Sequence, residues 1–306
     1  MYIMGIKDGI IGLIIGDALG VPVEFESRES LKKYPVNDMI GFGTYNMPSG
    51  TFSDDSSMVL AKMKAIVNNH GEIVYSAIMD EFVEWFVNSK YTQYNNTFDV
   101  GNTTRYSLLN YMDGGEPLDC GGTNERSNGN GSLMRILPLA FIKNITPETV
   151  EDISALTHGH TRSKIACVFY VELVKSILEE KMDLREHVKI ASEKTKKYYG
   201  DIDELAHYER ILDETIFDEK EENISSSGYV VDTLEAVIYV LVNTNNFKDA
   251  VLSAVNLGED TDTVGAIVGG VAGIYYGYDE IPEEWIFKIK CIDRIKELCC
   301  KYGNSI

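Results

Sequence analysis

Basic residues are scarce in this 306-residue sequence, which holds 28 lysines and arginines against 48 aspartates and glutamates, a formal net charge of −20. A surface of that sign repels phosphate backbones and anionic membranes, so it argues against nucleic-acid binding and membrane association. It still permits a small anionic ligand, provided that bound cations reverse the charge locally.

Cysteine and long apolar runs are also in short supply. The five cysteines are odd in number and none belongs to a CxxC pair, a profile typical of a reducing compartment. No uncharged run reaches the roughly 18–20 apolar residues of a membrane helix. Asp8 and Asp17 interrupt the apolar N-terminal region, which therefore lacks the layout of a signal peptide. We predict a cytoplasmic protein without a membrane span. The oligomeric state is not readable, and a monomer is favoured.

Linkers and alternating strand patterns are missing as well. No stretch rich in Pro, Gly and Ser divides the chain, and a hydrophobic fraction of 44% is enough for a sizeable core. Apolar residues recur instead at steps of three and four. We predict an all-α fold, a single compact orthogonal helical domain over residues 1–306, with roughly a dozen helices. The main predicted helices cover 6–19, 53–69, 73–87, 147–156, 162–180, 229–242, 247–257, 264–278 and 282–302, with another beginning at 132 and bending or ending near Pro138.

Glycines mark one of these helices. Gly9, Gly12, Gly16 and Gly20 recur at steps of three and four along the first helix, although glycine costs helix stability. Their spacing predicts that another backbone approaches this helix closely.

Two acidic stretches stand out, each just before a helix. Ser53-Asp54-Asp55 precedes an apolar-periodic run, where Ser53 could serve as an N-cap and the aspartates could simply face the helix dipole. Glu259 to Thr263 precedes a run that carries no charge before Asp279.

The second stretch is not explained by capping. Asp260 and Asp262 lead into a helix too apolar to lie on the surface, and buried carboxylates need a counter-charge. No lysine or arginine lies between Glu259 and Tyr278, so a divalent cation would supply it. All candidate ligands are oxygens, which favours magnesium, manganese or calcium over zinc. A calcium EF-hand loop beginning at Asp260 is excluded, because its twelfth position is Val271 instead of a bidentate glutamate.

Other polar residues allow two interpretations each. Glu24 is either a solvated loop residue or a site residue bracketed by apolar neighbours, and Asp99 is either a helix cap or a site residue. The glycine-rich stretch 127–135 is either a phosphate-binding loop or a plain turn, and it fits neither nucleotide-binding fingerprint. His158 and His160 lack an evident third zinc ligand, which favours structural or substrate-contacting roles.

Taken together, these stretches resemble the ADP-ribosylglycohydrolase family, which includes the dinitrogenase reductase-activating glycohydrolase and the ADP-ribosylarginine hydrolases. The resemblance covers nearly the whole chain. It is carried by seven motifs in order: Gly16-Asp17-Ala18-Leu19-Gly20 with Glu24, Ser53-Asp54-Asp55, Asp99-Val100-Gly101-Asn102-Thr103, the stretch 129–135, His158-Gly159-His160, the stretch 227–235, and Asp260-Thr261-Asp262-Thr263.

The resemblance implies an all-α fold with a binuclear magnesium or manganese site between helix N-termini. It implies six metal ligands: Ser53, Asp54, Asp55, Asp260, Asp262 and Thr263. Ser53 stands where the family more often has threonine, and the hydroxyl is retained. The residues implied to hold ADP-ribose are Gly101, Asn102, Asn130, Gly131, Ser132, Met134, His158 and Tyr229.

The implied reaction is metal-dependent hydrolysis of the glycosidic bond between ADP-ribose and an acceptor. Positive charge develops on the ribose as this bond breaks. A carboxylate must complete the proton transfers, and Asp99 and then Glu24 are the candidates. Asp99 matches the arginine-cleaving branch of the family better than the serine-cleaving one, so we expect ADP-ribosylated protein arginine as substrate. A free ADP-ribosylated small molecule or nucleotide is the alternative substrate, and a non-catalytic crystallin-like ADP-ribose-binding protein is the alternative of a different class.

Overall fold

Fourteen α-helices and nine short 3-10 helices make up the regular structure of residues 2–306, the part of the chain that the computed structural model describes. That part contains three isolated β-bridges and no β-strand, which confirms the all-α prediction. The α-helices are α1 (Tyr2–Gly20), α2 (Arg28–Lys33), α3 (Asp54–Asn68), α4 (Tyr75–Asn88), α5 (Asn102–Met112), α6 (Pro147–Ala155), α7 (Thr161–Glu179), α8 (Leu184–Tyr199), α9 (Glu209–Leu212), α10 (Val230–Val242), α11 (Phe247–Asn256), α12 (Thr261–Tyr276), α13 (Glu283–Lys288) and α14 (Ile292–Ser305).

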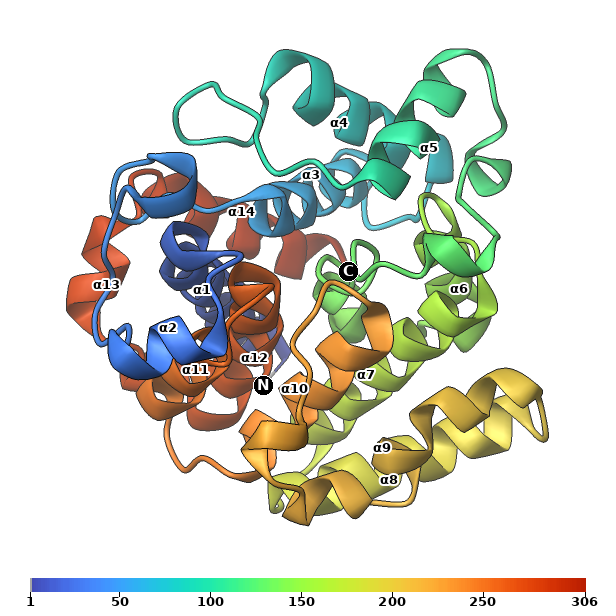
Figure 1. Ribbon diagram of the computed structural model, residues 1–306. Coiled ribbons are helices and arrows are strands. Elements are labelled where there is room, and N and C mark those ends of the chain that lie inside the picture. The colour runs from blue at the N-terminus through green and yellow to red at the C-terminus, as the bar shows by residue number, and fades with distance from the viewer. Residues whose placement is uncertain (1) are drawn as a thin grey trace.

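Helices α1 and α12 form the centre of the molecule and the other helices surround them (Figure 1). They pack through glycines: a Cβ atom on Gly12 or Gly16 would overlap the backbone carbonyl of Gly269 or Gly265, respectively. The close backbone approach predicted from the glycine spacing is therefore confirmed. It places the C-terminal end of α1 against the N-terminal end of α12, where a Cβ on Gly20 would overlap the backbone of Asp262.

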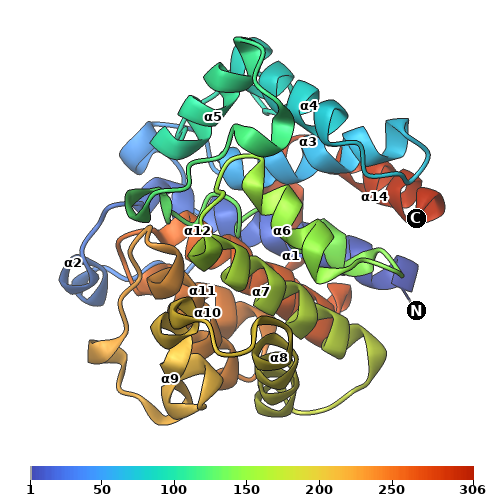
Figure 2. The same ribbon diagram turned by 90° about the vertical axis from the view of Figure 1, so that its right-hand side faces the viewer.

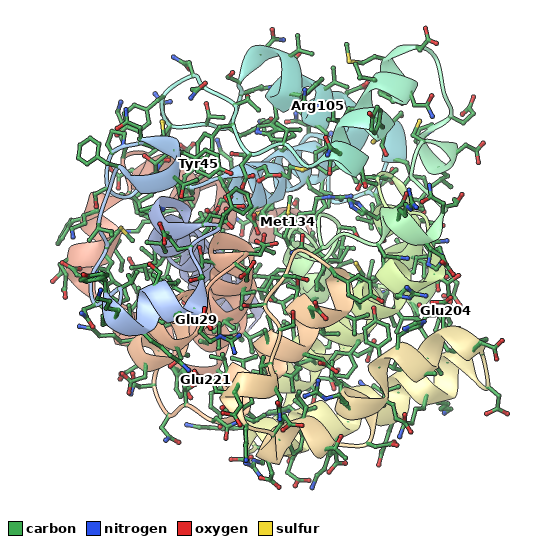
Figure 3. The ribbon with its side chains drawn as sticks, viewed as in Figure 1. Glu29, Tyr45, Arg105, Met134, Glu204 and Glu221 are labelled. Carbon is green, nitrogen blue, oxygen red and sulfur yellow. The ribbon has the colours of Figure 1, made fainter. Side chains whose placement is uncertain are left out.

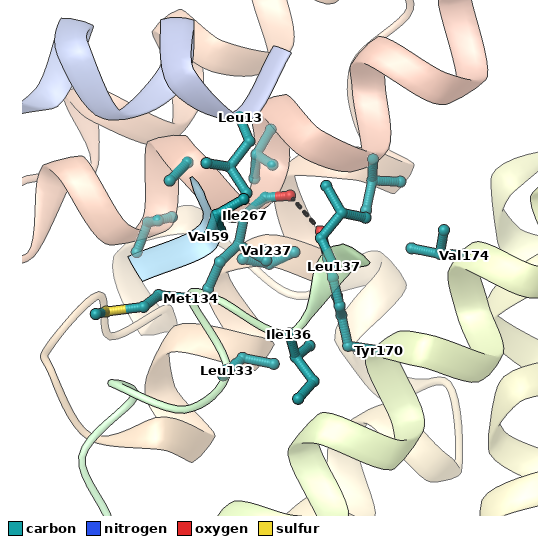
Figure 4. Close-up of a cluster of buried hydrophobic side chains, with 14 of the residues drawn as sticks. Leu13, Val59, Leu133, Met134, Ile136, Leu137, Tyr170, Val174, Val237 and Ile267 are labelled. Carbon is teal, nitrogen blue, oxygen red and sulfur yellow. Dashed lines mark hydrogen bonds between the residues drawn. The ribbon is translucent and has the colours of Figure 1, made fainter. Parts of the chain in front are cut away.

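The apolar core connects this central pair to α3, α7 and α10. Leu13, Val59, Val237 and Ile267 come from four different helices and lie in one buried cluster (Figure 4). The Tyr170 hydroxyl on α7 donates a hydrogen bond to the Ile267 carbonyl at 3.1 Å. A rigid scaffold thus holds the helix N-termini that carry the acidic stretches.

Helices α8 and α9 lie at the periphery, on the side opposite α4 and α5 (Figures 1 and 2). None of the described helices combines the length and the apolar composition that crossing a membrane requires.

Two helix predictions were wrong. Residues 131–135 form turns, and the 3-10 helix η5 (Leu137–Phe141) follows, so no helix begins at Ser132. Pro138 lies in the first turn of η5 and has no N–H to continue an α-helix from the preceding turn. The predicted C-terminal helix is divided into α13 and α14, because the backbone of Ile289 is extended between them.

A lysine buried beside a buried arginine is an unusual feature of this core. Lys62 on α3 donates to the backbone carbonyl of Arg135, both side chains are fully buried, and neither forms an ion pair within residues 2–306. Burial, and then the charge of Arg135, lower the pKa of Lys62 well below its usual value.

Lys62 should therefore make the free energy of unfolding vary with pH in the alkaline range. Between the folded and unfolded pKa values of Lys62 the unfolded chain binds the additional proton, so the free energy of unfolding rises with pH in that window. We expect the wild type to gain up to about 1.4 kcal/mol per pH unit relative to Lys62→Met over the alkaline range just below the unfolded pKa of lysine, about 10.4. Urea unfolding of both proteins across this range measures the difference. Equal slopes would contradict the prediction.

Candidate active site

The first acidic stretch lies at the N-terminus of α3, as predicted. Ser53 is the N-cap, and its hydroxyl oxygen accepts a hydrogen bond from the Asp55 N–H at 3.3 Å. Capping does not account for the aspartates, however, because Asp54 and Asp55 are 6% and 1% exposed. A carboxylate that only faced a helix dipole would remain in water.

Asp17 holds this helix end in place, a role that the sequence did not reveal. Its side chain, fully buried on α1, accepts hydrogen bonds from the Ser53 N–H at 2.8 Å, the Ser56 N–H at 3.0 Å and the Ser56 hydroxyl at 2.5 Å. Burial raises the pKa of Asp17 to about 7, and the hydrogen bonds from Ser56 and Ser53 oppose this shift. The one sequence feature that could have indicated this role is the position of Asp17, a charged residue within an apolar helix.

The second acidic stretch lies at the N-terminus of α12 and meets the first. The Thr263 hydroxyl donates to Asp55 Oδ2 at 3.3 Å, which directly connects the two stretches. Asp262 is fully buried, and its Oδ1 accepts from the Thr263 N–H at 2.9 Å. Asp260, half-buried, accepts from the Asn130 side-chain amide at 2.8 Å. Folding thus gathers all six predicted metal ligands at one place.

Glu24 lies within this cluster and is not a solvated loop residue. It is only 5% exposed. One carboxylate oxygen each from Glu24, Asp260 and Asp262 lie within 4.8 Å of one another, which is close enough to hold one cation. The sequence predicted a catalytic role for Glu24, whereas this geometry also suits a metal ligand. The apolar neighbours of Glu24 in the sequence indicated that it is buried, but nothing in the sequence indicated that it lies close to α12.

Asp99 faces Glu24 from the loop before α5. Its φ angle is +56°, an uncommon backbone conformation for a residue other than glycine. Burial, and then the negative charge of Asp99, raise the pKa of Glu24 to about 9. Tyr45 is a further neighbour that the sequence did not single out, and burial, followed by the nearby carboxylates Glu24 and Asp99, raises the pKa of its hydroxyl. Met134 lies near the middle of the face seen in Figure 3, and Tyr45 lies above and to the left of it.

The charge of this cluster is not compensated by the protein. No lysine or arginine forms an ion pair with its carboxylates in the described chain. Burial is the largest reason why the pKa values of Asp54, Asp55 and Asp262 lie well above the usual range, and their mutual repulsion adds to it. One oxygen each of Glu24, Asp55 and Asp262 is buried without a hydrogen-bond partner. Oxygen donors in this state fit hard divalent cations such as magnesium and manganese.

Three loops adjoin the cluster and bring most of the predicted substrate residues together. The N–H of Asn130 donates to the Gly228 carbonyl at 3.1 Å, and its side-chain amide also donates to the Thr233 hydroxyl at 2.9 Å. A Cβ on Gly131 would lie 2.8 Å from the His158 ring. Tyr229 precedes α10, and Gly129 forms a β-bridge with it. The glycine-rich stretch thus lies between the histidine loop and the start of α10.

The remaining predicted substrate residues differ in accessibility. Gly101 and Asn102 are exposed at the N-terminus of α5. Ser132 and Met134 are buried, and the Ser132 hydroxyl accepts a hydrogen bond from Ser154 at 2.9 Å. These two residues are thus packed into the protein interior.

The two histidines have separate structural environments. His158 is buried, its Nδ1 is 2.8 Å from the Thr157 hydroxyl, and burial lowers its pKa to about 3. His160 is the N-cap of α7, where its ring accepts from the Arg162 N–H at 3.2 Å. This agrees with a structural role for His160.

The family model and the similar proteins of known name all indicate the same family. The family model for ADP-ribosylglycohydrolase matches residues 5–304. The chain belongs to the ADP-ribosylglycohydrolase family. It is 32% identical, over 95% of its own length and 77% of the relative, to the ADP-ribosylarginine hydrolase Tri1 of Serratia proteamaculans. It is 31% identical, over 91% of its length and 88% of the relative, to the ADP-ribosyl-dinitrogen reductase glycohydrolase of Rhodospirillum rubrum.

A solved structure supports the same assignment. One chain of an ADP-ribosylglycohydrolase-related protein complex has a similar structure, with a TM-score of 0.83 and 25% sequence identity. The match covers 99% of this protein and 98% of that chain. The resemblance stated from the motifs is therefore confirmed. This ADP-ribosylglycohydrolase is a hydrolase of the glycosidic bond between ADP-ribose and an acceptor.

Proposed function

We propose that this enzyme removes ADP-ribose from arginine side chains of proteins and requires two magnesium or manganese ions. The observation that carries the proposal is the convergence of buried, unpartnered carboxylates from two distant helix N-termini beside the loops around Asn130 and Tyr229. The names of two relatives, one an ADP-ribosylarginine hydrolase and one acting on dinitrogen reductase, support the acceptor. Action as a monomer in the cytoplasm, with residues 1–306 as one domain, belongs to the same proposal.

The six residues predicted from the motifs would hold the cations: Ser53, Asp54, Asp55, Asp260, Asp262 and Thr263. Glu24 is close enough to Asp260 and Asp262 to join them. When bound, the ions would supply the positive charge that holds ribose hydroxyls and lowers the pKa of a water molecule.

The protein's own carboxylates complete the proton transfers. Asp99 is half-buried beside Glu24 and is our first candidate for the base that takes a proton from water and the acid that returns it to the leaving guanidine. Glu24 is the second candidate. Asp17 is a positioning residue, because it fixes the helix end that carries Asp54 and Asp55.

The acceptor can be tested directly. We expect the purified enzyme with manganese or magnesium to release ADP-ribose from arginine-linked protein, and chelator to stop the reaction. Release from serine-linked peptides alone would overturn the arginine assignment. Turnover of a free ADP-ribosylated nucleotide but not of protein would identify the small-molecule alternative. A folded, metal-loaded protein that binds ADP-ribose without turnover would indicate a binding protein.

The role of Asp99 is tested by Asp99→Asn. This change keeps the size of the side chain and removes its ability to exchange a proton at neutral pH. We expect kcat to fall by about 10²–10⁴-fold. The metal-induced increase in Tm should persist, which separates proton transfer from metal binding. Unchanged kcat would exclude Asp99 as the acid and base.

A further inference from the structure

Four aromatic residues lie close to Glu24 or Asp99, along the chain or through contacts of their own turns. Phe25 directly follows Glu24, and its ring is 67% exposed. Phe42 is 63% exposed. Tyr45 is a neighbour of Glu24 and Asp99, and its ring centroid lies 4.8 Å from that of Phe98, the residue before Asp99. Single exposed phenylalanines are common on protein surfaces, so exposure alone does not indicate a binding role. The backbone of the turns that carry Phe25 and Phe42 is the further evidence.

Both exposed rings stand on turns that the backbone fixes. Phe25 has a φ angle of +66°, and its N–H donates to the Glu259 carbonyl at 2.7 Å. Phe42 has a φ angle of +70°, and its N–H donates to the Met47 carbonyl at 2.5 Å. Left-handed backbone is costly for a bulky residue and recurs at functional sites.

The turn of Phe42 is also connected to the acidic cluster. Gly43, next along the chain, packs so closely on Pro22 that a Cβ would overlap its carbonyl. The Thr44 hydroxyl donates to the backbone carbonyl of Glu24 at 2.8 Å. The turns that carry the two rings are therefore fixed beside Glu24.

Exposed negative charge accompanies the rings. Glu26 and Glu259 are both exposed, and the Glu259 N–H donates to the Glu26 carbonyl at 2.9 Å. Neither carboxylate forms an ion pair in the described part of the chain. The neighbouring Arg28 forms no ion pair with either carboxylate, and its guanidinium instead donates to backbone carbonyls, including that of Leu257 at 2.8 Å.

We propose that Phe25, Glu26, Phe42 and Glu259 form a docking rim for a basic polypeptide segment around the modified arginine. Lysine and arginine side chains bind aromatic faces and carboxylates together, so the chemistry of this rim is complementary to a cationic segment. Free ADP-ribosyl-arginine has no flanking residues and does not need the rim. The inference rests on the proposed function and adds the class of target sequence.

The test compares three substrates: a peptide with one ADP-ribosyl-arginine flanked by lysines, the same peptide flanked by glutamates, and free ADP-ribosyl-arginine. For the wild type at low salt, kcat/KM should be about tenfold higher for the basic peptide than for the acidic one. Added salt should reduce this preference because it screens exposed charges.

Two double variants remove the rim. Phe25→Gly with Phe42→Gly removes both rings and introduces the residue that tolerates positive φ, so the fold should be retained. Glu26→Gln with Glu259→Gln removes the exposed charges. Each should raise KM for the basic peptide about tenfold with little change in kcat, and leave free ADP-ribosyl-arginine unaffected. Phe287→Ala is the matched control, since Phe287 is 75% exposed on α13, outside these turns.

Several results would overturn the docking rim. An equal loss on free ADP-ribosyl-arginine would show that the residues only support Glu24, and equal wild-type rates on the two peptides would show that flanking charge is not recognised. Fluorescence anisotropy with the unmodified basic peptide makes the test independent of hydrolysis. Wild-type binding that both double variants weaken about tenfold supports the rim even if arginine is not the acceptor, and absence of binding excludes it.

Discussion

Replacing Asp262 by asparagine is expected to lower hydrolysis by at least about 100-fold, a loss comparable to removing one electrostatic contact from a catalytic site. Asp262 Oδ2 is buried without a partner and is available to a cation, whereas Oδ1 accepts from the Thr263 N–H. Asparagine can still accept the hydrogen bond from the Thr263 N–H, but it lacks the negative charge that would bind a cation. The variant should therefore fold normally and bind metal poorly.

The same substitution should stabilise the metal-free protein. Burial and repulsion from Glu24, Asp99 and Asp55 raise the pKa of Asp262, so its negative charge is unfavourable without a cation. Removing it should raise the Tm of chelator-treated protein, by about 2–4 °C for each kcal/mol of relieved repulsion. Metal should raise Tm in the wild type and much less in the variant, because a ligand stabilises only the state that binds it.

Differential scanning calorimetry with chelator and with manganese measures both effects. Asp279→Asn is the matched control, because Asp279 is an exposed aspartate just beyond the other end of α12. A variant with lower metal-free Tm and an intact metal response would show that Asp262 has a structural role and is not a metal ligand. Asp54→Ala tests the other acidic stretch in the same assay and should also lose most of the metal-induced increase in Tm. Its rate of hydrolysis, measured separately, should fall as well.

Replacing Gly16 by alanine is expected to lower the free energy of unfolding by about 3 kcal/mol. The new Cβ would overlap the carbonyl of Gly265, and backbone in the middle of two packed helices cannot move aside locally. Separation of α1 from α12 would also displace Asp17 and Asp262 relative to each other, so metal affinity should fall with stability.

Gly9→Ala on the same helix is the matched control. A Cβ there would lie 2.9 Å from atoms of the Ile274 side chain, which can change rotamer. Alanine also favours helix over glycine by about 1 kcal/mol, so Gly9→Ala should change the free energy of unfolding by no more than about that amount. Chemical denaturation of both variants gives the comparison. Equal effects would contradict the backbone clash at Gly16.

Predictions from local sequence held where the side-chain pattern alone is decisive. The apolar spacing of α3, α7, α10 and α12 predicted helices, and the glycine spacing of α1 predicted a closely approaching backbone. The prediction of a helix beginning at Ser132 failed because Pro138 and the packing of residues 131–135 govern that segment. Local spacing does not report such contacts.

The sequence by itself determined the fold class, the two acidic helix ends and the oxygen character of the site, because spacing and residue type fix these locally. Only the tertiary structure decided that Glu24 lies beside Asp260 and Asp262, that Asp17 anchors α3, and that the turn of Phe42 is bound to the backbone of Glu24. These relations depend on which helix packs against α1 and on the backbone conformation of the turns, and no local pattern encodes either.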